Sequence, residues 1–468
     1  MSNKDLEKEL SYEKRSAWKN NAEINLLADS YKPYLDSSKT ERECVEASIL
    51  LAQKSGFVDL SEKIKSGTPI ASGDKLYYNH QNKCVVLFVM GTEPLQTGMN
   101  ITAAHIDSPR LDLKSNPLYE DSNLALLKTH YYGGIKKYQW TAVPLSMHGI
   151  IYTKDGKSIK LSVGENEDDP VFFVSDLLVH LSADQLDKKA SAAIAGEQLN
   201  VIAGSIPFDD EEVSKKVKFN ILKLLNEQYG LTEEDFLSAE IEIVPSGKSR
   251  DVGFDRGLIV GYGHDDKVCA FPALKAILDT NKPKRTCACI LADKEEIGSV
   301  GSTGLDGKFF ENIASEVYAL YTKNYNELHV KRMLAQSYVL SMDVTCAYDP
   351  NFPEAFDKSN TSIIGNGAVM KKYSGARGKS GTNDAHSEYL IKLRMLFNEN
   401  DIVFQTGELG KVDQGGGGTV AYMLANYGAM TVDFAVPVLS MHAPYELISK
   451  ADLYACYEGA KAFYAMKE

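Results

Sequence analysis

The chain has 468 residues, which is too long for one ordinary hydrophobic core and predicts two or three domains. Its net charge of -13 leaves no expected basic face to neutralise phosphates, so we expect no nucleic-acid binding. The seven scattered cysteines form no Cys-x-x-Cys pair, which argues against a disulfide framework or a zinc finger and favours a reducing compartment. The charged N-terminal segment and the lack of an apolar run of about 20 residues predict a soluble, cytoplasmic protein without a signal peptide or membrane span.

The first half of the chain mixes helices with short strands. Charged and apolar residues at helical spacing predict helices at 4–30 and 36–54. Strand-like apolar runs follow at 75–79, 83–91 and 99–107. Alternating residues around a Lys-Asp-Gly-Lys turn predict a β-hairpin over 140–164. Two more helices are expected at 175–193 and 211–229.

From about residue 240 strands and helices alternate. The expected strands are 241–246, 257–263, 286–292, 337–344, 403–407 and 431–441. The expected helices are 266–279, 309–325, 383–398 and 418–427. This alternation predicts an α/β fold with a mostly parallel sheet and helices on both faces, interrupted by an inserted β-rich domain. The predicted division is a main domain in two parts, 1–113 and 243–468, with the insertion at 114–242.

Five possible metal ligands follow or end apolar runs: His105, Asp265, Glu296, Asp343 and His442. Ligands bind at the carboxyl ends of strands in open α/β sheets, so these side chains are expected to converge. Two imidazoles and three carboxylates suit a pair of borderline-hard metal ions sharing a bridging carboxylate. Such ions, about 3.5–4 Å apart, activate a bridging water for hydrolysis. The pattern therefore predicts a metallohydrolase.

The acid next to Glu296 is the expected general base. Adjacent side chains of an extended backbone point in opposite directions, so Glu296 would bind metal while Glu295 faces the water. Asp107 shares a strand face with His105 and could accept the second ring N–H of that histidine. Each residue also has a purely structural alternative: helix capping for Asp265 or Asp266, a turn for the other acids and a half-buried loop for His442. His264 is a competing candidate, interpreted as a residue that supports a ligand or as a structural residue.

Five segments carry a resemblance to a known family: 103–114, 263–274, 293–304, 341–350 and 440–453. In sequence and order they resemble the aspartyl aminopeptidase family of dinuclear zinc peptidases, over most of the chain. The resemblance implies that Asp265 bridges two zinc ions. It pairs His105 with Asp343 at one ion, and Glu296 with His442 at the other. It also implies Glu295 as general base, with Asp107 supporting His105.

The resemblance extends to the substrate and the assembly. His180 is similar to a histidine that the family's inserted domain presents to a neighbouring subunit, and Lys371 to a lysine that contacts substrate. Members assemble as tetrahedral dodecamers through dimers made by the inserted domain. The chain departs from the family at Lys411, where an arginine is common, and at Cys346, where a histidine is frequent. Arginine and lysine are not interchangeable, so a divergent bacterial-type branch is indicated and strict acidic specificity is not assumed.

The predicted function is a metal-dependent aminopeptidase that releases single N-terminal residues, acidic ones among the candidates, from short peptides. Glu295 would activate a metal-bridging water. Two divalent ions are expected, zinc first, with cobalt or manganese as alternatives. A dinuclear deacylase or amidohydrolase acting on N-acyl substrates is the alternative, and a scaffold with structural metals is a second. The partners expected are peptides with a free N-terminus and further copies of the chain, without nucleic acid or membrane.

Overall fold

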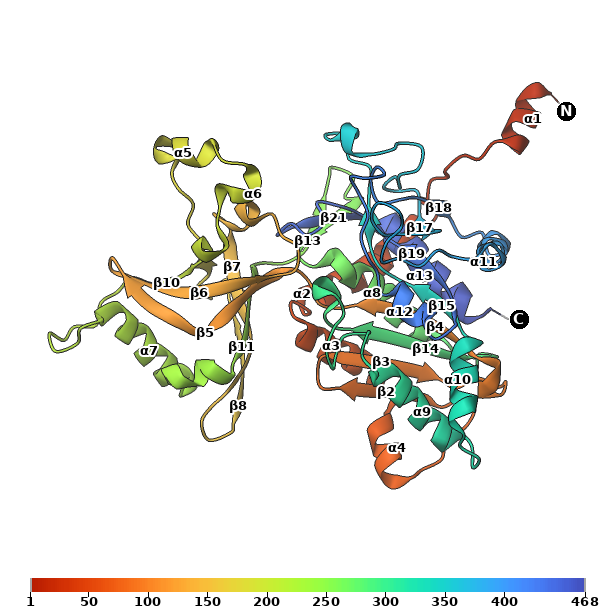
Figure 1. The fold of residues 1–468 in the computed structure, drawn as a ribbon, viewed down its shortest axis with the longest axis horizontal. Helices are drawn as coiled ribbons and strands as arrows, with labels where there is room; N and C mark the ends of the chain where they lie inside the picture. The colour runs from red at the N-terminus through yellow and green to blue at the C-terminus, as the bar shows by residue number, and fades with distance from the viewer. Residues whose placement is uncertain (1, 467–468) are drawn as a thin grey trace.

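The computed structural model describes residues 2–466, which form two parts (Figure 1). The larger part, at the right of the figure, is built on a nine-stranded sheet. The smaller part, at the left, is a β-rich domain, a name used here for the seven-stranded sheet and the helices that connect its strands. A third sheet of five strands lies within the larger part.

The nine-stranded sheet has the order β1-β2-β3-β14-β4-β15-β19-β17-β18. Its strands are β1 (Val58–Asp59), β2 (Lys75–His80), β3 (Cys84–Val89), β4 (Met99–His105), β14 (Thr286–Ala292), β15 (Tyr338–Ser341), β17 (Ala368–Lys371), β18 (Phe404–Thr406) and β19 (Met430–Ala435). The four central strands, β14, β4, β15 and β19, are parallel neighbours. The mostly parallel α/β sheet predicted from the sequence is therefore confirmed.

Side chains of the sheet alternate between two hydrophobic cores. On β3, Val85 and Leu87 enter one core while Val86 and Phe88 enter the other, as the two-residue period of a strand requires. The first core contains α2 (Asn21–Asp36), α3 (Glu41–Lys54), α8 (His264–Asp279), α11 (Ser387–Glu399) and α13 (Lys450–Tyr464). The second contains α4 (Leu60–Ser66), α9 (Phe309–Tyr321), α10 (Glu327–Ala335) and α12 (Ala421–Ala425). Both faces are covered, as predicted.

The strands of the β-rich domain pair in the order β11-β5-β6-β10-β9-β7-β8, and a further pairing between β11 and β7 closes six of them into a barrel. Its strands are β5 (Arg110–Asp121), β6 (Leu124–Tyr132), β7 (Pro144–Tyr152), β8 (Ser158–Val163), β9 (Phe172–Phe173), β10 (Val201–Gly204) and β11 (Glu240–Pro245). Its α-helices are α5 (Ala183–Leu186), α6 (Ala190–Ala193) and α7 (Lys216–Tyr229). Strands β7 and β8 pair as the predicted hairpin. The domain has a hydrophobic core of its own.

The five-stranded sheet joins the two ends of the second half of the chain. Its order is β12 (Arg250–Val252), β13 (Leu258–Gly261), β21 (Glu446–Ser449), β20 (Pro437–Leu439) and β16 (Thr345–Cys346). Strand β13 leads directly into α8, and the β20–β21 turn lies beside it through the antiparallel pairing of β13 with β21. This sheet therefore brings residues near 265 and 442 together.

Two of the predicted helices are wrong, and one predicted strand forms but lies in another sheet. The helix expected at 4–30 is two helices, α1 (Asn3–Leu10) and α2, because the intervening backbone bonds elsewhere: Ala17 donates its amide to Gly365 O at 2.8 Å. The helix expected at 175–193 is reduced to the short η3 (Val179–Leu181), α5 and α6, since its apolar side chains stay exposed and no packing supports a longer helix. Residues 241–246 belong to the β-rich sheet rather than opening the α/β part.

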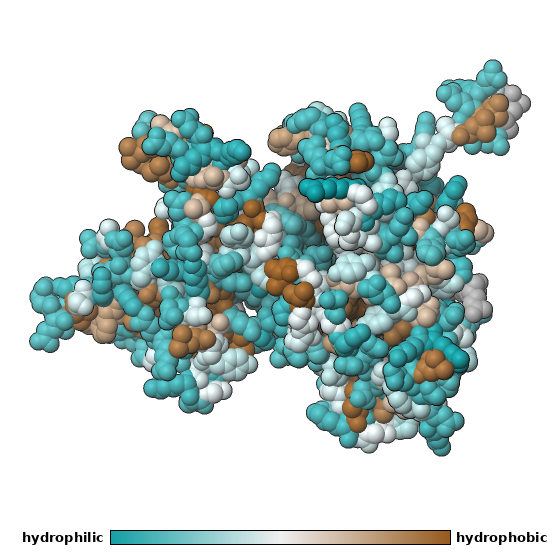
Figure 2. Space-filling model, in the orientation of Figure 1, coloured by the Kyte–Doolittle hydropathy of each residue, from teal (hydrophilic) through white to brown (hydrophobic). Residues whose placement is uncertain are grey.

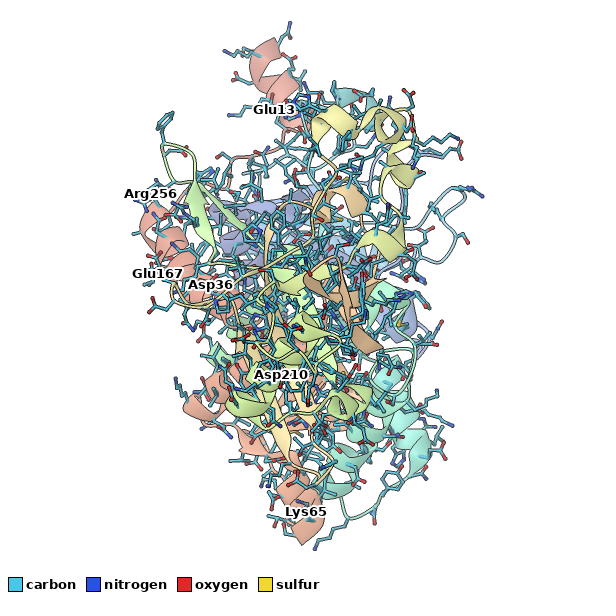
Figure 3. All side chains as sticks on the ribbon, turned by 90° about the vertical axis from the view of Figure 1, so that its left-hand side faces the viewer. Glu13, Asp36, Lys65, Glu167, Asp210 and Arg256 are labelled. Atoms are coloured by element: carbon cyan, nitrogen blue, oxygen red, sulfur yellow. The ribbon has the colours of Figure 1, made fainter. Side chains whose placement is uncertain are left out.

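The surface is polar and charged over most of the molecule. Charged residues such as Lys65, Glu167, Asp210 and Arg256 are exposed to solvent (Figure 3). Among the helices of residues 2–466, none has the length and apolar character needed to cross a lipid bilayer.

Candidate metal centre

Three neighbouring parallel strands deliver polar side chains to one edge of the large sheet. His105 is the last residue of β4, and Asp343 lies two residues beyond the end of β15. Glu295 and Glu296 lie in η6 (Glu295–Ile297), just after β14. Because β14, β4 and β15 are adjacent and parallel, their carboxyl ends coincide. His105, Asp343, Glu295 and Glu296 therefore converge at the carboxyl ends of parallel strands, as the sequence predicted.

The other two predicted ligands approach from the five-stranded sheet. Asp265 is the second residue of α8, and His442 lies in the turn between β20 and β21. Asp265 Oδ1 is 3.1 Å from His105 Nε2, and Asp265 Oδ2 is 3.1 Å from His442 Nε2. One carboxylate therefore lies between two imidazoles, with a separate oxygen facing each.

The remaining acids lie around Asp265 and the two histidines. Asp343 Oδ1 lies 3.8 Å from His105 Nε2, and Glu296 Oε1 lies 3.4 Å from His442 Nε2. Glu295 Oε2 is 4.0 Å from His105 Nε2. His105, Asp265 and Glu296 present ligand atoms that are all within 4.8 Å of one another, and so do His105, Asp266 and Asp343.

The electrostatics of the cluster fit divalent cations. Burial and, after it, the neighbouring carboxylates raise the pKa of Glu295 to about 8 and that of Asp343 to about 6. Burial and then the charge of Asp265 raise the pKa of Glu296. Among residues 2–466, no group donates a hydrogen bond to the buried Glu296 Oε1. Crowded, desolvated carboxylates with an unpaired oxygen need nearby positive charge, so these residues fit a pair of divalent ions.

The two histidines are oriented by their other ring nitrogens. His105 Nδ1 is 3.1 Å from the carbonyl oxygen of Asp107 and 3.2 Å from its carboxylate Oδ1. His442 Nδ1 is 2.7 Å from the carbonyl oxygen of Gly134. Both acceptors require an N–H at Nδ1, which leaves each Nε2 lone pair directed at Asp265.

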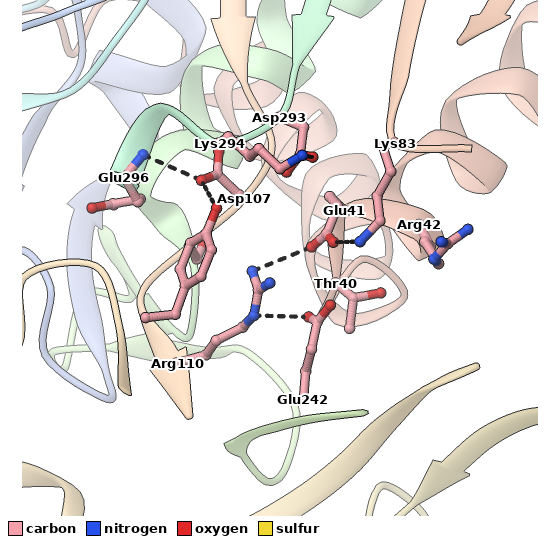
Figure 4. Close-up of polar contacts among 12 residues, drawn as sticks. Thr40, Glu41, Arg42, Lys83, Asp107, Arg110, Glu242, Asp293, Lys294 and Glu296 are labelled. Atoms are coloured by element: carbon pink, nitrogen blue, oxygen red, sulfur yellow. Dashed lines mark hydrogen bonds and ion pairs between the residues drawn. The ribbon is translucent and has the colours of Figure 1, made fainter. Parts of the chain in front are cut away.

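Two buried carboxylates hold the backbone of three candidate ligands and of the expected general base. Asp107 Oδ1 accepts the amide N–H of Glu295, and Asp107 Oδ2 accepts that of Glu296, both at 3.2 Å (Figure 4 shows the second). Glu446 accepts the amide N–H of Asp265 at 2.9 Å and that of His442 at 2.7 Å. Sequence reasoning missed Glu446, although its position four residues after His442 was the available signal.

Other residues singled out from the sequence lie in different surroundings. Lys371 is buried at the end of β17, where it donates to Val344 O at 3.3 Å and its charge acts on the carboxyl of Asp343. His180 is exposed on η3 of the β-rich domain, next to α5, which Figure 1 shows well away from the large sheet. His264 Nδ1 bonds to the Tyr31 hydroxyl at 2.8 Å, as expected for a structural residue.

Comparison with known proteins identifies the class of enzyme. The family model described as aminopeptidase I zinc metalloprotease (M18) matches residues 34–464. A probable M18 family aminopeptidase 1 of Clostridium acetobutylicum is 51% identical over 460 residues, covering 97% of this chain and 99% of the relative. The crystal structure of an M18 aminopeptidase of Thermotoga maritima superposes with a TM-score of 0.93 at 41% identity, over 97% of this chain and 99% of the other.

A more distant structure shares the fold. The mApe1 dodecamer of S. cerevisiae gives a TM-score of 0.75 at 19% identity, over 95% of this chain and 97% of that one. The fold and the matched family together define a zinc metalloprotease, a hydrolase that acts on peptide bonds. More particularly, the chain belongs to the M18 family of aminopeptidases.

Proposed function

We propose that this aminopeptidase releases single N-terminal residues from short peptides at a centre of two divalent metal ions. The ligands proposed are His105, Asp343, Glu296 and His442, with Asp265 bridging. The observation that carries this assignment is the Asp265 carboxylate, whose two oxygens each lie 3.1 Å from a different imidazole Nε2. A carboxylate shared in this way suits two ions better than one.

The metal ions would polarise the scissile carbonyl and lower the pKa of water; zinc is proposed first, with cobalt or manganese as alternatives. Glu295 would accept a proton from the attacking water and donate it to the leaving amine. Its position supports this role, because Glu295 Oε2 lies 4.0 Å from Nε2 of the proposed ligand His105. Asp107 would orient His105 and, through two backbone amides, the η6 turn that carries both glutamates.

Two residues are proposed to contact the substrate. Lys371 lies near Asp343 with its ammonium group buried, where it would meet the side chain of an acidic N-terminal residue. His180 would enter the site of a neighbouring subunit, which agrees with its exposure on the β-rich domain. The proposed division of the chain is 1–113, 114–242 and 243–468, and strands β5 and β11 of the β-rich domain cross its two boundaries.

The assembly proposed is a homo-oligomer, with a tetrahedral dodecamer as its form. Figure 2 shows apolar side chains gathered at α5 of the β-rich domain. The exposed large hydrophobic residues around it include Leu178, Val179, Leu181 and Leu186. Such a surface favours burial against a second copy. The fold likeness to a dodecameric protein also supports it. Mass photometry would show a species near twelve chains; a monomer at micromolar concentration would contradict it.

The activity test is a panel of aminoacyl-anilides with Asp, Glu, Leu, Lys and Ala, assayed with and without a chelator. Release that the chelator abolishes and zinc restores is expected, and the ranking would give the preferred N-terminal residue. The matched control is the N-acetylated form of the best substrate, which an enzyme needing a free amine would leave intact. Cleavage of the acetylated substrates alone would contradict the proposal and indicate a deacylase.

A further inference from the structure

The segment Tyr132-Gly133-Gly134, at the end of β6, reaches from the β-rich domain to the candidate metal centre. The Tyr132 hydroxyl donates to Asp107 Oδ2 at 2.8 Å. The carbonyl oxygen of Gly134 lies 2.7 Å from His442 Nδ1. Between them, Gly133 is so close to Glu296 that an added Cβ would lie 3.2 Å from Oε2 of that glutamate. Three consecutive residues thus contact groups on both sides of the centre.

The position of Tyr132 is itself constrained. The Arg110 guanidinium carbon lies 3.8 Å from the centre of the Tyr132 ring, a stacked cation–π contact. Arg110 is anchored in turn by Glu41 of α3 at 3.3 Å and by Glu242 of β11 at 3.3 Å, as Figure 4 shows. Asp112 of β5 adds a third contact at 2.8 Å. The tyrosine is therefore held by the large part of the molecule and by the β-rich sheet together.

Each candidate histidine ligand depends on this segment through its Nδ1 acceptor. For His442 the dependence is direct, because Gly134 O is the acceptor. For His105 it runs through Asp107, whose carboxylate receives the Tyr132 hydroxyl in addition to the ring and two backbone amides. Groups that bond the second nitrogen of a ligand histidine fix its tautomer and orientation, and their loss commonly costs about 10–100-fold in metal affinity or activity.

We propose that residues 132–134 are a positioning element of the metal centre, with Tyr132 acting through Asp107 and Gly134 acting through His442. The β-rich domain is then part of the catalytic apparatus of its own chain. The inference rests on the proposed metal centre, and it assigns Tyr132 no contact with metal or substrate. Because Tyr132 lies on a different sheet from the ligands, any shift of the β-rich domain would be transmitted to both histidines.

The test is Tyr132→Phe, which removes one hydroxyl and keeps the ring under Arg110. The matched control is Tyr131→Phe, since Tyr131 is 41% exposed and, as the residue before Tyr132 on β6, lies on the opposite face of that strand. Three quantities would be measured: zinc affinity by competition with a chelator, the visible spectrum of the cobalt-substituted protein, and kcat and KM separately. The cobalt spectrum reports ligand geometry, which a purely structural role would not change.

For Tyr132→Phe we expect a 10–100-fold loss in zinc affinity or in kcat, an altered cobalt spectrum and an unchanged KM. Tyr131→Phe should match the wild type in all three. A Tyr132→Phe protein with the wild-type affinity, spectrum and kcat would overturn the inference alone, and so would one that only melts earlier. A wild-type chain that binds neither zinc nor cobalt would overturn the metal centre and this inference with it.

Gly133→Ala provides a second variant in case the tyrosine substitution unfolds the protein. Gly133 has φ +74°, and the new Cβ would lie 3.2 Å from Glu296 Oε2. The expected result is again an altered cobalt spectrum with reduced zinc affinity, because the glutamate must move. Gly156→Ala is its matched control, since that glycine also has a positive φ, +80°, but has open space around it. Equal spectra for the two variants would contradict the role assigned to the segment.

Discussion

Replacing His148 with glutamine should change how the stability of the protein depends on pH. His148 lies on β7, and its imidazole is buried between acids from two places. Its Nδ1 is 2.7 Å from Glu43 of α3, and its Nε2 is 3.2 Å from Glu165, which follows β8. The contact therefore joins the β-rich domain to a helix of the large part.

The size of the effect follows from the pKa of His148. Burial alone would lower it, but hydrogen bonds to Glu165 and Glu43, with their negative charges, raise the pKa to about 9 from 6.5. The Lys39 ammonium lies 3.7 Å from the Glu165 carboxylate, and its positive charge weakens the attraction between Glu165 and protonated His148. A rise of about 2.5 units corresponds to roughly 3 kcal/mol of stabilisation by the protonated ring. Because the folded pKa is the higher one, this stability is fully present below about pH 6.5 and is lost as the pH rises through about 9.

The assay is urea unfolding of the wild type and His148→Gln between pH 6 and 10. The wild type should be more stable by up to roughly 3 kcal/mol at pH 6, and the difference should shrink across the window from 6.5 to 9. The matched control is His130→Gln, an exposed histidine of the same sheet, which should give no such pH-dependent difference. The reasoning would be refuted if the difference in free energy of unfolding between wild type and His148→Gln stayed constant or grew as the pH rises.

Three shorter predictions concern the metal centre. Glu295→Gln should lower turnover by about 10²–10⁴-fold with full metal content by elemental analysis, because only the proton acceptor is lost; near-normal turnover would contradict its role. Glu446→Gln would turn a side-chain amide N–H toward the backbone N–H of Asp265 or His442, so the free energy of urea unfolding should fall by about 1–3 kcal/mol. The control is the exposed Glu399→Gln, and equal stability of the two variants would contradict the role given to the Glu446 carboxylate. Removing metal by chelation should lower the melting temperature by several degrees, since bound ions at 100 times their Kd add about 2.7 kcal/mol; restoration by zinc is expected, and an unchanged melting temperature would contradict a bound metal.

The sheet and the convergence of its strand-end residues could be predicted because their signals are local in the sequence. An apolar run followed by His105 or Asp343 places a polar side chain at a strand end, and parallel pairing brings such ends together. The helix prediction for residues 175–193 was wrong because the apolar residues of this segment indicated a packed helix, while they are exposed in the structure. Tyr132 was missed because its importance comes from a contact across the fold with Asp107, and Glu446 because its contact with Asp265 joins residues far apart in the chain.

The hydrogen bonds from backbone amides to Asp107 and Glu446 explain how so many acids can be placed in one buried site. Each of the two accepts a separate pair of backbone amides: Asp107 those of Glu295 and Glu296, and Glu446 those of Asp265 and His442. Burial would raise the pKa of Asp107, but His105 and the Tyr132 hydroxyl hold it below its usual value. Burial and then the charge of Asp265 raise the pKa of Glu446 to about 8, although two backbone amides and His442 lower it. Asp107 also accepts the Tyr132 hydroxyl, so the β-rich domain adds one donor to those that the larger part of the molecule supplies to this carboxylate.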